Sequence, residues 1–161
     1  MNAFDPERIV RVLARHKVRY ILVGAAAARL HGFPRLTADA DITPAPDADN
    51  LKRLGSALRA LHARIYTEAV PEGLAFSCDQ PTLTRGGLWN LITDAGRIDL
   101  IFKPSGTEGF DDLAKSAVPF SVFGIEIRVA SLADILRSKR ASNRPQDQQD
   151  VPVLEEMLKR L

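Results

Sequence analysis

Two aspartates, Asp39 and Asp41, lie two positions apart in the short segment Thr37-Ala-Asp39-Ala-Asp41-Ile42. Side chains alternate between the two faces of a strand, so both carboxylates would project from the same face. Burying either charge without a partner would be costly. A divalent cation would remove their mutual repulsion, and magnesium prefers oxygen ligands of this kind. The alternative is a solvent-facing side of a strand that carries two aspartates with no chemical role.

A third aspartate, Asp99, lies inside the apolar segment from Arg97 to Phe102. In a strand, Ile98 and Leu100 would face one side and Asp99 the other. Aspartate is depleted in strands, so an acid at this position is unusual. If the two acidic strands are neighbours, three carboxylates converge and could hold one or two metal ions for phosphoryl-type transfer. The alternative is a salt bridge from Asp99 to Arg97.

A phosphate-binding turn is a further candidate at Gly24, where an apolar strand from Tyr20 to Val23 meets a segment of helix formers. Glycine allows a tight turn and a close approach of backbone to ligand. The helix that follows would point free N–H groups and its positive dipole end at that turn, which favours phosphate. An ordinary strand-to-helix turn has the same sequence pattern.

A lysine, Lys139, extends the apolar stripe formed by Leu132, Ile135 and Leu136 on a predicted helix that begins after Ser131. Such a lysine either lies at the edge of the stripe with its charge in solvent or points into a cleft toward a polyphosphate. The surroundings are basic, and two acids that follow could pair with the arginines. These residues are Arg137, Arg140, Arg144, Asp147 and Asp150.

The elements that must position these residues follow the order strand–helix–strand–helix, then mostly strands, then helices. This order predicts an α+β fold with a mixed β-sheet flanked by helices. We expect one domain over residues 1–161, with residues 130–161 as a short helical C-terminal part. Asp5 before Pro6 predicts a helix start, and Pro145 predicts a break before a last helix from Val151. The remaining expectations are a strand over 74–78, a loop over 81–87, and hairpins around 94–96 and 123–124.

Composition limits the class of protein. The chain has 161 residues, a formal net charge of +2 and 45% hydrophobic residues, which excludes a disordered or fibrous protein. The single cysteine, Cys78, excludes an intrachain disulfide framework and a multi-cysteine zinc site. The most apolar stretch, Tyr20 to Ala28, is too short to span a bilayer, so a cytoplasmic protein without a membrane partner is expected. The sequence lacks the P-loop and nucleophile-elbow motifs.

Two longer stretches carry a family resemblance. They are Tyr20-Ile-Leu-Val-Gly-Ala-Ala-Ala-Ala-Arg-Leu-His-Gly-Phe-Pro-Arg-Leu-Thr-Ala-Asp-Ala-Asp-Ile42 and Val129-Ala-Ser-Leu-Ala-Asp-Ile-Leu-Arg-Ser-Lys-Arg-Ala-Ser-Asn-Arg-Pro-Gln-Asp147. Together with the later Asp99, they resemble the nucleotidyltransferase superfamily of DNA polymerase beta. They are most similar to its small bacterial members of the AbiEii/MenT toxin type. The resemblance covers most of the chain from about Ile9.

The resemblance implies roles for particular residues. Asp39 and Asp41 would hold magnesium, with two ions expected, and Asp99 would be a third metal ligand or the base that accepts the proton of the acceptor hydroxyl. Two small residues of the first motif would face the nucleotide phosphates, and three charged residues of the second motif would contact the triphosphate or position it. In this sequence they are Gly24 and Ala25, followed by Lys139, Arg144 and Asp147. The family has Gly or Ser where this chain has Ala25.

The implied activity is magnesium-dependent transfer of a nucleoside monophosphate from an NTP such as ATP to an acceptor hydroxyl. The acceptor could be a tRNA 3′ end, a protein hydroxyl or a small molecule. Family analogy favours the tRNA 3′ end, with the chain as the toxin of a toxin–antitoxin pair and a cognate antitoxin protein as partner. The alternative is a non-catalytic member of the same fold that binds a nucleotide or a partner and regulates it. Ala25 and the short helical C-terminal part favour that alternative.

Overall fold

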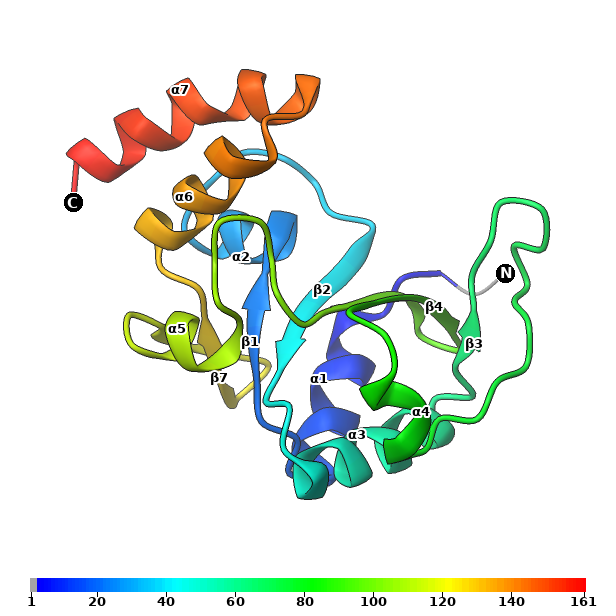
Figure 1. The fold of residues 1–161 in the computed structure, drawn as a ribbon. Coiled ribbons are helices and arrows are strands. Elements are labelled where there is room, and N and C mark those ends of the chain that lie inside the picture. The colour runs from blue at the N-terminus through cyan, green and yellow to red at the C-terminus, as the bar shows by residue number, and fades with distance from the viewer. Residues whose placement is uncertain (1–2) are drawn as a thin grey trace.

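The computed structural model describes residues 3–161, and its central feature is a seven-stranded mixed β-sheet with the strand order β3-β4-β5-β2-β1-β7-β6 (Figure 1). The strands are β1 (Tyr20–Val23), β2 (Asp39–Pro44), β3 (Arg64–Ile65), β4 (Leu88–Thr93), β5 (Gly96–Ile101), β6 (Val118–Val122) and β7 (Ile125–Val129). Strand β2 lies at the centre, antiparallel to β1 and parallel to β5. The mixed sheet of the predicted α+β fold is confirmed.

Helices surround this sheet and form a helical C-terminal end (Figure 1). They are α1 (Pro6–Arg15), α2 (Gly24–Leu30), α3 (Ala48–Ala60), α4 (Gln80–Thr84), α5 (Phe110–Ala114), α6 (Leu132–Ser142) and α7 (Pro145–Lys159). Ala40 and Ile42 on β2 are buried, and Ile98 and Leu100 are buried on β5. On these two strands the side chains that alternate with them, among them Asp39, Asp41 and Asp99, face the opposite side of the sheet.

Local capping explains where several helices begin. The side chain of Asp5 accepts a hydrogen bond from Arg8 N at 3.1 Å, and Pro6 occupies the first turn of α1, as the sequence predicted. Ser131 caps α6 in the same way, because its hydroxyl oxygen accepts from Asp134 N at 3.1 Å. These bonds satisfy amide groups that have no partner within the helix.

The predicted start of the last helix is wrong. Helix α7 begins at Pro145 rather than at Val151, and Pro152 lies inside it. Proline lacks an N–H, but the first residue of a helix needs none and its fixed φ suits that position. Asp147 fixes this start by accepting a hydrogen bond from Arg144 N at 3.1 Å. The predicted break at Pro145 is present, because α6 ends at Ser142, and the same proline begins the next helix.

The segment between α3 and β4 also differs from the prediction. Residues 74–78 were expected to form a strand, but the pairing there is an isolated bridge between Ile65 and Leu74. Residues 81–87 were expected to be a loop, and their first part lies in α4. The side chain of Asp79 accepts from Thr82 N at 3.0 Å and starts this helix, again with a proline in the first turn.

Within residues 3–161, the helices are all too short or too polar to cross a membrane.

Candidate functional site

The three predicted aspartates converge at the centre of the sheet. Asp41 on β2 is the direct parallel partner of Asp99 on β5, and Asp39 pairs with Arg97 two residues earlier on each strand. Carboxylate oxygens of Asp39, Asp41 and Asp99 all lie within 4.8 Å of one another. Strand alternation puts the three side chains on the same face, opposite the buried Ala40. The geometry on which the sequence interpretation depended is therefore present.

These carboxylates are costly to ionise together. Burial and, after it, the neighbouring charges of Asp39 and Asp99 together raise the pKa of Asp41 to about 7. Burial, followed by the charge of Asp99, also raises the pKa of Asp39 above its usual range. Desolvation and like charge disfavour the ionised form of these carboxylates. A bound cation would stabilise that form.

Arg97 is a basic side chain at this cluster. Its Nη2 donates to Asp99 Oδ1 at 2.8 Å, and its guanidinium lies 3.9 Å from the centroid of the Tyr66 ring. The salt bridge offered as an alternative explanation of Asp99 therefore exists beside the acidic cluster and does not replace it. Arg97 opposes the rise in the pKa of both Asp39 and Asp41.

Gly24 fits closely against Asp41. Its φ is +68°, in the left-handed region that favours glycine, and a Cβ atom added to it would lie 2.3 Å from Asp41 Oδ2. Any larger residue would therefore displace a carboxylate oxygen of the cluster. Gly24 is also the first residue of α2.

The cluster lies in a cleft of about 760 Å³ between the sheet and helix α6. Lining residues include five acidic and two basic side chains: Asp39, Asp41, Asp99, Asp134, Asp147, Lys139 and Arg144. Gly24 also lines it, so the cleft brings together all of the predicted site residues except Ala25, which is not among its lining residues within 3–161. Their roles stay predictions.

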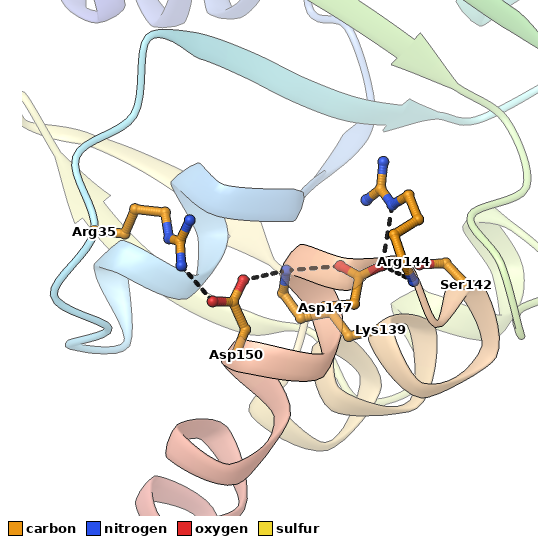
Figure 2. Close-up of polar contacts among 6 residues, drawn as sticks. All are labelled: Arg35, Lys139, Ser142, Arg144, Asp147 and Asp150. Atoms are coloured by element: carbon orange, nitrogen blue, oxygen red, sulfur yellow. Dashed lines mark hydrogen bonds and ion pairs between the residues drawn. The ribbon is translucent and has the colours of Figure 1, made fainter.

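The wall opposite the sheet is an ion-pair network (Figure 2). Lys139 Nζ lies 3.3 Å from Asp147 Oδ1 and 3.0 Å from Asp150 Oδ2. Asp147 also accepts hydrogen bonds from Arg144 and Ser142. Burial alone would raise the pKa of Asp147, but these hydrogen bonds hold it well below its usual range. Lys139 therefore lines the cleft, as one interpretation predicted, but its ammonium group is paired with two carboxylates.

The basic residues on α6 and at the start of α7 are largely neutralised. Arg137 pairs with Asp112 and Asp134, both at 3.0 Å. Arg140 and Arg144 also pair with acids, Arg140 with Glu155 at 3.5 Å. These pairs reduce the positive field that α6 can present to a polyanion.

Sequence reasoning missed several residues at the cleft. Asn90 on β4 pairs with Asp99 and lines the cleft. The predicted turn over 94–96 would have placed Asn90 opposite Leu100, but Gly96 already pairs with Thr93 and shifts the register by one residue. Ser105 and Thr107, in the loop after β5, line it as well, but no local pattern indicates this.

The acidic cluster fits a magnesium site by the chemistry of its donors. Three carboxylates supply hard oxygen ligands within reach of one ion. The raised pKa values of Asp39 and Asp41 reflect a negative charge that a cation would balance. Asp39, Asp41 and Asp99 are the residues that would hold it.

Comparison with known proteins gives structural relatives only. No family model matches the chain, and no curated protein matches it. A lincosamide antibiotic adenylyltransferase, LnuA, solved with lincomycin bound, is 17% identical with a TM-score of 0.62 over 97% of this chain and 99% of that one. The Thermotoga maritima protein TM1012, provisionally described as a nucleotidyltransferase, is 16% identical with a TM-score of 0.54 over 100% and 98%.

A third structure, the antibiotic-resistance factor ANT(2″)-Ia, is 15% identical with a TM-score of 0.53 over 96% of this chain and 89% of that one. At these identities the likeness establishes the architecture and no residue's role. The chain therefore has a fold that it shares with solved nucleotidyltransferases, with its acidic cluster in a cleft at the centre of the sheet.

Proposed function

We propose that this protein is a magnesium-dependent nucleotidyltransferase that moves a nucleoside monophosphate from an NTP such as ATP to an acceptor hydroxyl. The observation that carries the proposal is the convergence of Asp39, Asp41 and Asp99 within 4.8 Å at the wall of an open cleft. The cleft is lined by more acidic than basic side chains. A triphosphate would be repelled there unless divalent cations accompany it, and one or two magnesium ions at the three carboxylates meet that requirement.

The reaction would be an in-line displacement at the α-phosphorus. The acceptor oxygen bonds to that phosphorus, the bond to the bridging oxygen of the β-phosphate breaks, and pyrophosphate leaves with the electron pair. Bound magnesium would neutralise charge that develops on the phosphate oxygens. The proton of the acceptor hydroxyl would pass to a carboxylate of the cluster, for which Asp99 is our candidate. Lys139 and Arg144 line the opposite wall and would contact the leaving phosphates.

The family resemblance favours a tRNA 3′ end as the acceptor, with this chain as the toxin of a toxin–antitoxin pair in the cytoplasm. A second acceptor class, a small molecule with a free hydroxyl, is favoured by the paired arginines of α6 and of the start of α7. Two of the similar structures are an antibiotic adenylyltransferase and an antibiotic-resistance factor. The cleft of about 760 Å³ is large enough for a nucleotide with part of an acceptor.

The test is label transfer. Purified protein is incubated with magnesium and each α-labelled NTP, together with either total RNA or a panel of small hydroxyl compounds. Label on RNA supports the tRNA assignment, and label on a small compound supports the second. Asp39→Ala should abolish transfer, whereas Asp111→Asn, at an exposed acid on α5, should leave it unchanged. Equal transfer by wild type and Asp39→Ala would overturn the proposal.

The non-catalytic alternative predicts a different result. Calorimetry with NTP and magnesium would then show binding without any transfer to either acceptor class. One of its two supports is weaker in the structure, because Ala25 is not among the residues, within 3–161, that line the cleft.

A further inference from the structure

Asp150 is a buried carboxylate on α7 that the proposed chemistry does not use. The residue is 2% exposed. One of its oxygens accepts from the guanidinium of Arg35, and the other lies 3.0 Å from Lys139 Nζ (Figure 2). A carboxylate at this depth is stable only when both oxygens have partners. Asp150 therefore joins two side chains that lie far apart in the sequence.

The first of these partners, Arg35, belongs to the segment that leads into β2 and to Asp39 and Asp41, the proposed metal ligands. The carbonyl oxygen of Arg35 accepts from Arg29 Nη1 at 3.2 Å, and its guanidinium lies 5.7 Å from the ring of Phe33. The next residue, Leu36, is 81% exposed. The ion pair between Arg35 and Asp150 therefore anchors this segment to α7.

The second partner, Lys139, lines the cleft with only 16% of its side chain exposed. Two carboxylates share its ammonium group and so fix where it points. Removal of the Asp150 charge would leave Asp147 as its carboxylate partner among residues 3–161, and Asp147 already accepts from Ser142 and Arg144. The ammonium group would then be free to turn toward the acidic cluster across the cleft, where it would compete with the cation.

We propose that Asp150 is a positioning residue that couples the two sides of the nucleotide site, because it aims Lys139 at the polyphosphate and anchors the segment before Asp39 through Arg35. This inference rests on the proposed function. Asp150 touches neither substrate nor metal in this scheme. Its effect should therefore appear as weaker binding of nucleotide and magnesium, more than as a slower chemical step.

The experiment compares steady-state kinetics of wild type with Asp150→Asn, which keeps the shape of the side chain and removes its charge. We expect the KM for NTP and the half-saturating magnesium concentration to rise about tenfold, with kcat changed by less than about threefold. Calorimetry with nucleotide and magnesium, without acceptor, should show the same loss of affinity. A merely structural role would lower the melting temperature and leave both binding values unchanged.

A second variant keeps the test decisive if Asp150→Asn does not fold. Arg35→Gln removes the partially exposed end of the same chain of contacts, and it should raise the half-saturating magnesium concentration, whereas Arg35→Lys should restore it in part. If Asp150→Asn folds, the double variant should be no worse than Asp150→Asn alone, since Asp150→Asn already breaks the ion pair that Arg35→Gln removes.

The matched control is Glu155→Gln, which removes another acid of α7 from a surface pair with Arg140; its kinetics should equal those of wild type. Wild-type protein that neither binds nucleotide nor transfers label would overturn the proposed function, and this inference with it. Active wild-type protein whose KM and magnesium requirement are unchanged by Asp150→Asn, or by Arg35→Gln where the first variant is unfolded, would overturn the inference alone.

Discussion

Aspartates on the two walls of the cleft have pKa values that are shifted in opposite directions. On the sheet wall, burial and mutual repulsion raise the pKa of Asp39 and Asp41. On the α6–α7 wall, Asp147 is less exposed to solvent than these two residues, yet hydrogen bonds from Arg144 and Ser142 lower its pKa. Solvent exposure alone therefore does not explain the difference, and the hydrogen-bond donors around Asp147 do. Carboxylates short of donors are suited to hold a cation, whereas the compensated ones stabilise the fold.

The largest effect on stability should come from removing the Asp147 charge on the α6–α7 wall. Asp147→Asn leaves Lys139 and Arg144 short of a buried partner, and we expect it to lower the free energy of unfolding by about 3 kcal/mol or more. Chemical denaturation at pH 7 measures this change. Because the pKa of Asp147 is lowered by folding, its contribution is present at neutral pH and is lost as the pH falls below about 4. An unchanged unfolding midpoint would contradict the comparison.

Magnesium should stabilise the sheet wall by removing its repulsion. At a concentration about a hundredfold above its Kd, the ion should add nearly 3 kcal/mol to the free energy of unfolding, seen as a higher melting temperature at pH 8. Asp41→Asn should abolish this increase. Asp111→Asn, at an exposed acid outside the cleft lining, should keep it. An equal increase in Asp41→Asn and wild type would place the ion elsewhere.

Asp41→Asn should make the metal-free protein more stable at pH 8 while it removes activity. The folded pKa of Asp41 is about 7, above its unfolded value near 4, so the folded state binds more protons between these values and wild-type stability falls as the pH rises through them. Asparagine resembles the protonated form. We expect a gain of about 2 kcal/mol at pH 8 and almost none at pH 4 in thermal melts. A melting temperature of metal-free Asp41→Asn below that of wild type at pH 8 would contradict the predicted gain in stability.

The smallest effect concerns Arg97, which partly compensates the sheet wall. Tyr66→Leu keeps apolar contact beneath the guanidinium but removes the aromatic ring that lies 3.9 Å from it. The expected loss is about 1 kcal/mol in urea unfolding. The magnesium-induced stabilisation should persist, because the Tyr66 ring contacts Arg97 and is not one of the proposed ligands. Complete loss of that stabilisation would mean that the ring itself organises the cluster.

Local signals in the sequence predicted much of the fold. The helix caps at Asp5 and Ser131 and the turn at Gly24 are confirmed. Predictions failed where a residue has two structural meanings. The predicted break at Pro145 is present, since α6 ends at Ser142, but the same proline begins α7 where Val151 was expected, because proline suits a first helical turn as well as a break. The single-domain organisation over residues 1–161 stays a prediction.

The sequence by itself determined which side chains share a face. Strand alternation puts Asp39 and Asp41 together and Asp99 opposite Ile98 and Leu100, because that periodicity is a property of the backbone. Only the tertiary structure decided that β2 lies parallel to β5 with Asp41 opposite Asp99, and that Arg35 meets Asp150 across 115 positions of sequence. Pairing of distant strands and ions depends on how the whole chain buries its apolar surface, and no local pattern encodes that.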